Sequence, residues 1–98
     1  MDYTLFNHTL DMGSPPESFN EELKAMWWER KNYWDRGHEI VQNLPGKTAA
    51  WVHAYLHRKE GDLVNASYWY ERAGKPVAEG DLNEEFREIV KILLEKNN

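Results

Sequence analysis

The chain has 98 residues, which is enough for one domain with a small hydrophobic core. It contains no cysteine, which excludes disulfides and thiolate metal sites, and its net charge of −5 disfavours duplex nucleic-acid binding. The sequence has no signal-peptide pattern and no apolar stretch near the roughly 18 residues that cross a membrane, so we expect a soluble cytoplasmic protein that does not enter membranes.

The N-terminal segment has scattered apolar residues without a clear period. We therefore expect residues 1–13 to form an arm that packs across the domain or reaches a neighbouring subunit, and residues 14–98 to form a single helical domain. Two start signals compete for the first helix of that domain, namely Ser14 followed by two prolines and a capping box at 18–21. This helix is expected to end near Arg30.

Four more helices are predicted from helical spacing of apolar residues and from Gly, Pro and Asn between them. They are expected at about 33–43, 48–60, 63–73 and 82–96. Asn32 breaks the chain before the first of these, Gly61 ends the second, and Asp62 caps the third. The third is expected to bury Leu63 together with Ala66, Trp69, Tyr70 and Ala73. Because β-branched runs typical of strands are missing, the fold class is predicted to be all-α.

The chain contains a weak internal repeat. Placing Asn32 on Gly61 also places Gly37 on Ala66 and Val41 on Tyr70, so small residues match small ones and large residues match large ones. This predicts two stacked antiparallel helical hairpins, at about 18–44 and 48–74. The last helix, at about 82–96, is expected to cap the open end of the stack.

The second hairpin resembles a known repeat family. Gly61-Asp62 followed by Ala66-x3-Tyr70-x2-Ala73 resembles the second half of a tetratricopeptide repeat, and the same segment is similar to the Sel-like variant. The longer run Trp51–Pro76 resembles short uncharacterised bacterial proteins. The resemblance implies an α-α superhelix. One departure is that His53 and His57 occupy positions where such repeats usually carry packing residues.

In tetratricopeptide hairpins the first helices line a concave groove, so the resemblance implies a binding groove here. Its candidate residues are Trp51, Tyr55, Arg58, Lys59, Glu22, Met26, Glu29 and Arg30. An aromatic shelf beside a guanidinium suits a peptide side chain and a carboxylate. The leading hypothesis is therefore a non-catalytic module that binds a protein or peptide. Two interpretations stay open beside it. One is an intramolecular pair of Glu29 with Arg58, and the other is a homo-oligomer, such as a homodimer, with a Trp-rich interface.

Three histidines give a third hypothesis. His53 and His57 are spaced i, i+4 and share one helical face, and His38 on the neighbouring helix offers a third ligand for a metal ion, with one coordination position left open. We favour a structural role without cofactor or metal, in which the histidines form buried hydrogen bonds. The candidate hydrogen-bond partners are Glu29, Glu60 and Asp62.

Motifs for catalysis were not found. The serines lack a nucleophile-elbow context, and the chain has neither a phosphate loop nor a dinucleotide-binding pattern. The adjacent acids Glu84 and Glu85 are explained by the dipole at the start of the last helix. No enzymatic activity is therefore predicted, except under the metal hypothesis.

Overall fold

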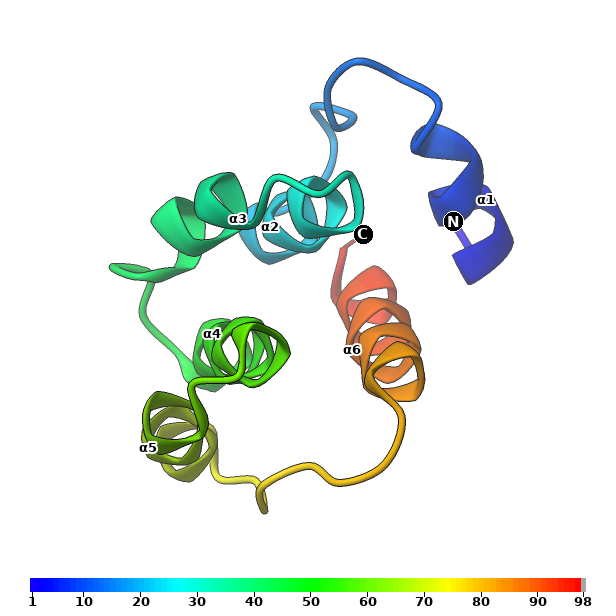
Figure 1. Ribbon diagram of the computed structural model, residues 1–98. Coiled ribbons are helices and arrows are strands. Elements are labelled where there is room, and N and C mark those ends of the chain that lie inside the picture. Colours follow the sequence, from blue (N-terminus) through cyan, green and yellow to red (C-terminus); the bar gives the residue numbers. More distant parts are fainter. Residues whose placement is uncertain (98) are drawn as a thin grey trace.

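The structure, a computed structural model, describes residues 1–97 and contains helices but no strands within that range. This confirms the all-α class. Residues 1–97 form six helices rather than the five expected (Figure 1). In chain order they are α1 (Tyr3–Thr9), α2 (Glu21–Arg30), α3 (Trp34–Val41), α4 (Lys47–Glu60), α5 (Leu63–Ala73) and α6 (Leu82–Lys96).

Helices α2 and α3 pack against each other as a hairpin. Helix α2 begins later than either predicted start signal, because residues 16–19 form a turn that buries Phe19. The N-cap is Asn20, whose Oδ1 accepts a hydrogen bond from the backbone N–H of Leu23 at 2.9 Å. The break after α2 is at Asn32, as expected, and its φ of 71° is in the left-handed region.

Helices α4 and α5 form the second hairpin. Gly61 ends α4 with a φ of 89°, and the Asp62 side chain accepts from the backbone N–H of Asn65, so both predicted signals are confirmed. The prediction that Leu63 faces inward is wrong, since 62% of it is exposed. Helix α5 packs along α4, and its Tyr70 hydroxyl also reaches Glu85 on α6.

A close approach between α2 and α3 requires the small residue at Gly37. A Cβ atom at this position would lie 2.8 Å from the carbonyl oxygen of Ala25, which is shorter than real Cβ contacts. In the second hairpin Ala66, the residue paired with Gly37 by the internal repeat, is buried to 1% exposure. Small residues therefore occupy corresponding positions in the two hairpins.

The N-terminal arm contains a helix that the sequence did not reveal. The Asp2 side chain caps α1 by accepting from the backbone N–H of Leu5, and Phe6 is fully buried in the core. The indole N–H of Trp27 donates to the Thr9 hydroxyl at 3.1 Å. The arm therefore packs on its own domain, which was one of the two expected arrangements.

Helix α6 contacts α1, α2 and α4 (Figure 1). The apolar residues that recur at three- and four-residue spacing along α6 form a stripe, in which Phe86, Ile89, Val90 and Leu93 are at most 1% exposed. Its backbone lies against α1, α2 and α4, and it reaches α5 through the hydrogen bonds of Glu85 with Tyr70, so its position differs from the expected cap at the end of the stack. The stripe is instead buried on the face that α2 and α4 share.

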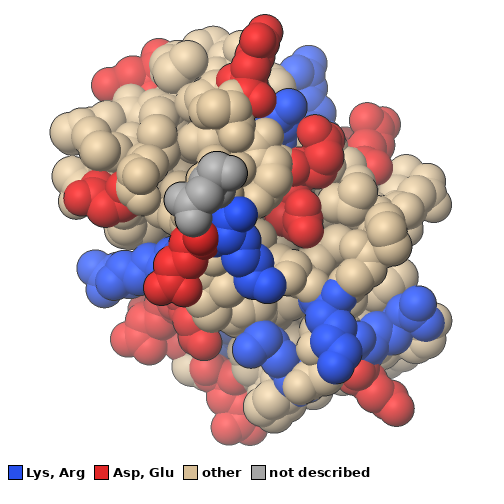
Figure 2. Space-filling view, turned by 180° about the vertical axis from the view of Figure 1, so that it is seen from behind, with Lys and Arg blue, Asp and Glu red and all other residues tan. Residues whose placement is uncertain are grey.

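Basic and acidic side chains are interspersed over the face shown in Figure 2. This pattern agrees with a net charge of −5 that arises from 12 basic and 17 acidic residues. None of the described helices is long and apolar enough to span a membrane.

Candidate metal centre

The predicted groove lies beneath α6 rather than open to solvent. Met26, Glu29, Trp51 and Tyr55 are at most 5% exposed. Glu22, Arg30 and Arg58 are partly buried, and of the eight predicted groove residues Lys59 alone is exposed. The expectation that Trp51 and Tyr55 present an accessible aromatic surface is thus corrected, because the apolar stripe of α6 covers the face formed by α2 and α4.

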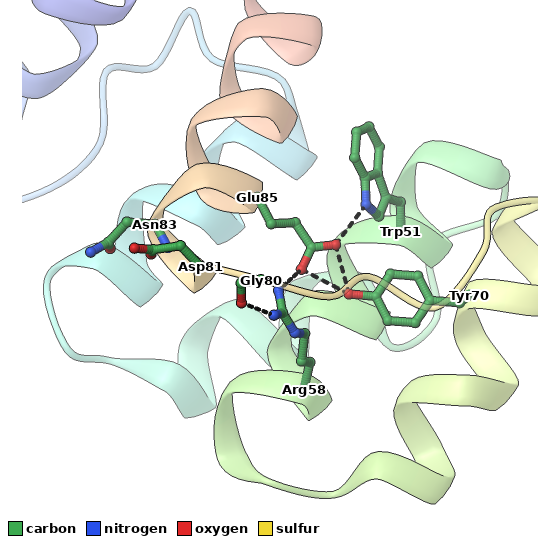
Figure 3. Close-up of polar contacts among 7 residues, drawn as sticks. All are labelled: Trp51, Arg58, Tyr70, Gly80, Asp81, Asn83 and Glu85. Carbon is green, nitrogen blue, oxygen red and sulfur yellow. Dashed lines mark hydrogen bonds and ion pairs between the residues drawn. The ribbon is translucent and has the colours of Figure 1, made fainter.

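A buried carboxylate fastens α6 to the second hairpin (Figure 3). Glu85 is 6% exposed and accepts hydrogen bonds from the Trp51 indole at 3.1 Å and the Arg58 guanidinium at 2.9 Å. The Tyr70 hydroxyl lies 2.8 and 2.6 Å from the two Glu85 oxygens. Burial and the bond to Glu85 raise the pKa of Tyr70, so its hydroxyl remains a donor. Arg58 also donates to the Gly80 carbonyl.

The remaining charged groove residues also find partners within the chain. Glu29 pairs with Lys59, not with Arg58 as the intramolecular interpretation expected. The Arg30 guanidinium lies 3.6 Å from the centre of the Phe86 ring on α6. These contacts leave the predicted carboxylate-binding arginines engaged by α6 or its linker.

The three candidate metal ligands, by contrast, come together. His38 on α3 and His53 and His57 on α4 each offer one ring nitrogen, and these atoms lie within 4.8 Å of one another. The Nε2 atoms of His38 and His53 face each other at 3.0 Å. His53 is 4% and His57 8% exposed, so the cluster lies at the inner side of the junction between the two hairpins.

This spacing is close to that of a zinc site. With Zn–N bonds of 2.0–2.1 Å and tetrahedral angles, two ligand nitrogens are separated by about 3.3 Å. The His38–His53 pair is therefore nearly at its final separation, and the third nitrogen requires a shift of roughly 1.5 Å at most. Nδ1 of His53 is buried and has no hydrogen-bond partner among the described residues, so the cluster is not a fully satisfied hydrogen-bond network.

Two tryptophans hold the imidazole rings in place. Trp34 stacks on His38 with ring centres 4.9 Å apart, and Trp69 stacks on His53 at 4.0 Å. The Trp34 indole in turn donates to the carbonyl of Leu56 on α4 at 2.8 Å, which fixes the α3 side of the cluster against α4. The rings are thus oriented by packing before any ligand binds.

The electrostatics of the site favour neutral imidazoles at His53 and His38. Burial, followed by repulsion from His38 and His57, lowers the pKa of His53 to about 4. Burial and then His57 also lower the pKa of His38, against smaller opposing effects of nearby carboxylates. Neutral rings carry the free lone pairs that metal ions require.

Of the expected carboxylate partners, Glu60 contacts a histidine of the cluster directly. Its Oε2 lies 2.6 Å from Nδ1 of His57. A carboxylate oxygen of Asp62 lies within 4.8 Å of a ring nitrogen of His57, but Asp62 also caps α5. Glu29 instead pairs with Lys59. Glu85 was missed as a core residue, although its position four residues before Ile89 on the apolar stripe of α6 is a signal that reveals its burial.

Comparisons with protein-family models, with curated proteins and with solved structures found no match. The resemblance to tetratricopeptide and Sel-like repeats stays a prediction, as does the likeness to bacterial proteins. Function is therefore inferred from the geometry of this chain alone.

Proposed function

We propose that this protein binds a divalent transition-metal ion through His38, His53 and His57. The observation that carries the proposal is the convergence of three ring nitrogens from two helices to within 4.8 Å. The Nε2 atoms of His38 and His53 add support, because their separation of 3.0 Å is already close to that of two zinc ligands.

The donor set indicates which ions fit. Three imidazole nitrogens suit Zn²⁺, Cu²⁺ or Ni²⁺, whereas Mg²⁺ and Ca²⁺ prefer oxygen ligands. The site has three protein ligands and a fourth position for water, as many zinc sites do. Because the ligands come from α3 and α4, a bound ion would join the two hairpins. The role supported here is binding and cross-linking, without a catalytic step.

Partner binding on the face of α2 and α4 is less well supported. An incoming peptide would have to displace α6. This would expose the four buried side chains of its stripe, Phe86, Ile89, Val90 and Leu93, and each would lose about 1.5–3 kcal/mol of burial free energy. That total, roughly 6–12 kcal/mol, is as large as the whole binding free energy of a micromolar ligand, about 8 kcal/mol. A Trp-rich oligomer interface also loses support, since Trp27 and Trp51 are buried within the chain.

Metal titration of chelator-treated protein without an affinity tag tests the proposal. Zinc at 100 times its Kd should stabilise the fold by about 2.7 kcal/mol, which raises Tm by roughly 10–20 °C. Copper should quench the fluorescence of Trp34 and Trp69, which stack on the ligand rings. The variant His38→Gln should lose most of the rise in Tm and most of the quenching, because it removes one of the three ligands. His38 is partly exposed, so the substitution should cost the core little stability.

The matched control is His8→Gln, which changes an exposed histidine on α1. It should bind metal like the wild type. Absence of any Tm shift with zinc, copper and nickel would overturn the proposal, and so would wild-type affinity in His38→Gln.

A further inference from the structure

Glu60 is the last residue of α4 and carries the one carboxylate hydrogen-bonded to the histidine cluster among the described residues. Its Oε2 lies 2.6 Å from Nδ1 of His57, and its side chain is 38% exposed, compared with 10% for His57. An ionised carboxylate can only accept a hydrogen bond. The proton of neutral His57 therefore resides on Nδ1, which leaves the lone pair on Nε2.

We propose that Glu60 is a positioning residue of the metal centre, which fixes the tautomer and ring orientation of His57 so that Nε2 is the ligand atom. This inference rests on the proposed metal-binding function. A histidine that binds a metal through one nitrogen usually donates its other N–H to a carboxylate or carbonyl, and removal of that partner weakens metal binding about 10–100-fold.

The position of Glu60 in α4 argues against a purely helix-stabilising role. The C-terminal end of a helix carries partial negative charge, so an acidic residue in the last turn is unfavourable there. The other charged residues of this turn, Arg58 and Lys59, have the favourable sign. An exposed ion pair returns little, typically 0–1 kcal/mol.

The neighbouring candidates do not fill the same role. Asp62 already accepts hydrogen bonds from the backbone and side chain of Asn65 as the cap of α5. Nδ1 of His53 is buried without a partner, and the His38 ring is held by its stack on Trp34. Among the three ligands, His57 is thus the one with a carboxylate in the outer shell.

The experiment compares zinc affinity, measured by competition with a chromogenic chelator, in Glu60→Ala, Glu60→Gln and the wild type. Alanine removes the acceptor and should weaken binding about 10–100-fold. Glutamine keeps an acceptor oxygen for the Nδ1–H group and should recover a large part of that loss. Unfolding of the metal-free variants should stay close to wild type, because Glu60 is exposed.

The matched control is Glu39→Gln, which removes one negative charge beside His38 without a hydrogen bond to a ligand. It should change affinity less than Glu60→Ala. An equal loss in the control would reduce the role of Glu60 to its charge and overturn the inference. If Glu60→Gln and Glu60→Ala lose zinc affinity equally and alter the Co²⁺ absorption spectrum, Glu60 is itself a metal ligand. That result would also overturn the inference.

The outcome separates the two proposals. If the wild type binds zinc and Glu60→Ala binds within twofold of it, only the positioning role fails. If the wild type binds no metal, the proposed function itself fails.

Discussion

The carboxylate of Glu85 is the polar anchor of α6, and Glu85→Gln tests that docking with little change in side-chain volume (Figure 3). In the variant Arg58 lies beside a neutral amide instead of a carboxylate. One amide oxygen can still accept from Tyr70, but the amide NH₂ then faces the indole N–H of Trp51 or the guanidinium, both of which are donors. At least one buried donor is left without an acceptor.

The magnitude follows from these contacts. A hydrogen bond to a charged group contributes about 1.5–3 kcal/mol, and a buried donor left unpaired costs about 1–3 kcal/mol. We expect the free energy of unfolding to fall by about 2–4 kcal/mol in Glu85→Gln. Glu85→Ala also leaves the Arg58 charge without its ion-pair partner, so the loss should reach about 3–5 kcal/mol. Since small domains have about 5–15 kcal/mol of stability, the Gln variant should remain folded.

Urea denaturation followed by circular dichroism measures this effect. The control is Glu88→Gln, which makes the same charge change at an exposed position of α6 and should alter stability by less than about 0.5 kcal/mol. If Glu85→Gln and Glu88→Gln have the same transition midpoint and slope, the anchoring role of Glu85 is refuted.

Two further predictions concern packing and pH. Gly37→Ala forces a Cβ atom against the Ala25 carbonyl and should destabilise the fold by about 1–3 kcal/mol. The control Gly13→Ala, whose Cβ atom would meet nothing within 4 Å, should leave stability unchanged. Equal melting temperatures for the two variants would contradict the close approach of α2 and α3. The pKa of His53 is about 4 in the folded chain and near 6.5 when unfolded, so the unfolded state binds the proton more tightly. Stability of the metal-free protein should be complete above pH 6.5 and fall by about 2–3 kcal/mol towards pH 4. The urea midpoint should depend less on pH across this range in His53→Gln. If the midpoint of that variant falls with pH as steeply as in the wild type, His53 is not the group responsible.

Local signals in the sequence predicted most helix boundaries, because they act through neighbouring residues. Gly61 can take a left-handed conformation and Asp62 can cap a helix whatever the rest of the chain does. The same is true of the break at Asn32. The stripe over 86–94 identified the buried face of α6 because helical spacing alone fixes which residues share a face.

The position of α6 and the short helix α1 could not be predicted in this way. A helix with one apolar face is stable on any complementary surface, and the stripe does not say whether that surface is the end of a stack or the face of α2 and α4. Residues assigned to a groove, such as Trp51 and Met26, consequently became core. Helix α1 has seven residues and is held by Phe6 and a side-chain cap, so propensity gave no sign of it.

The histidine cluster could be predicted only in part, because it depends both on local spacing and on tertiary packing. The i, i+4 spacing placed His53 and His57 on one face, but only the packing of α3 on α4 brings His38 to them. In a chain of 98 residues with a small core, the buried imidazoles of His53 and His57 at this junction cost stability, because apolar side chains there would satisfy the same packing without an orphaned nitrogen. Local arrangements that cost stability are typical of functional sites. A bound ion would accept the lone pairs of the three converging ring nitrogens and would join α3 to α4, so the ligand geometry and the location of the cluster support the same function.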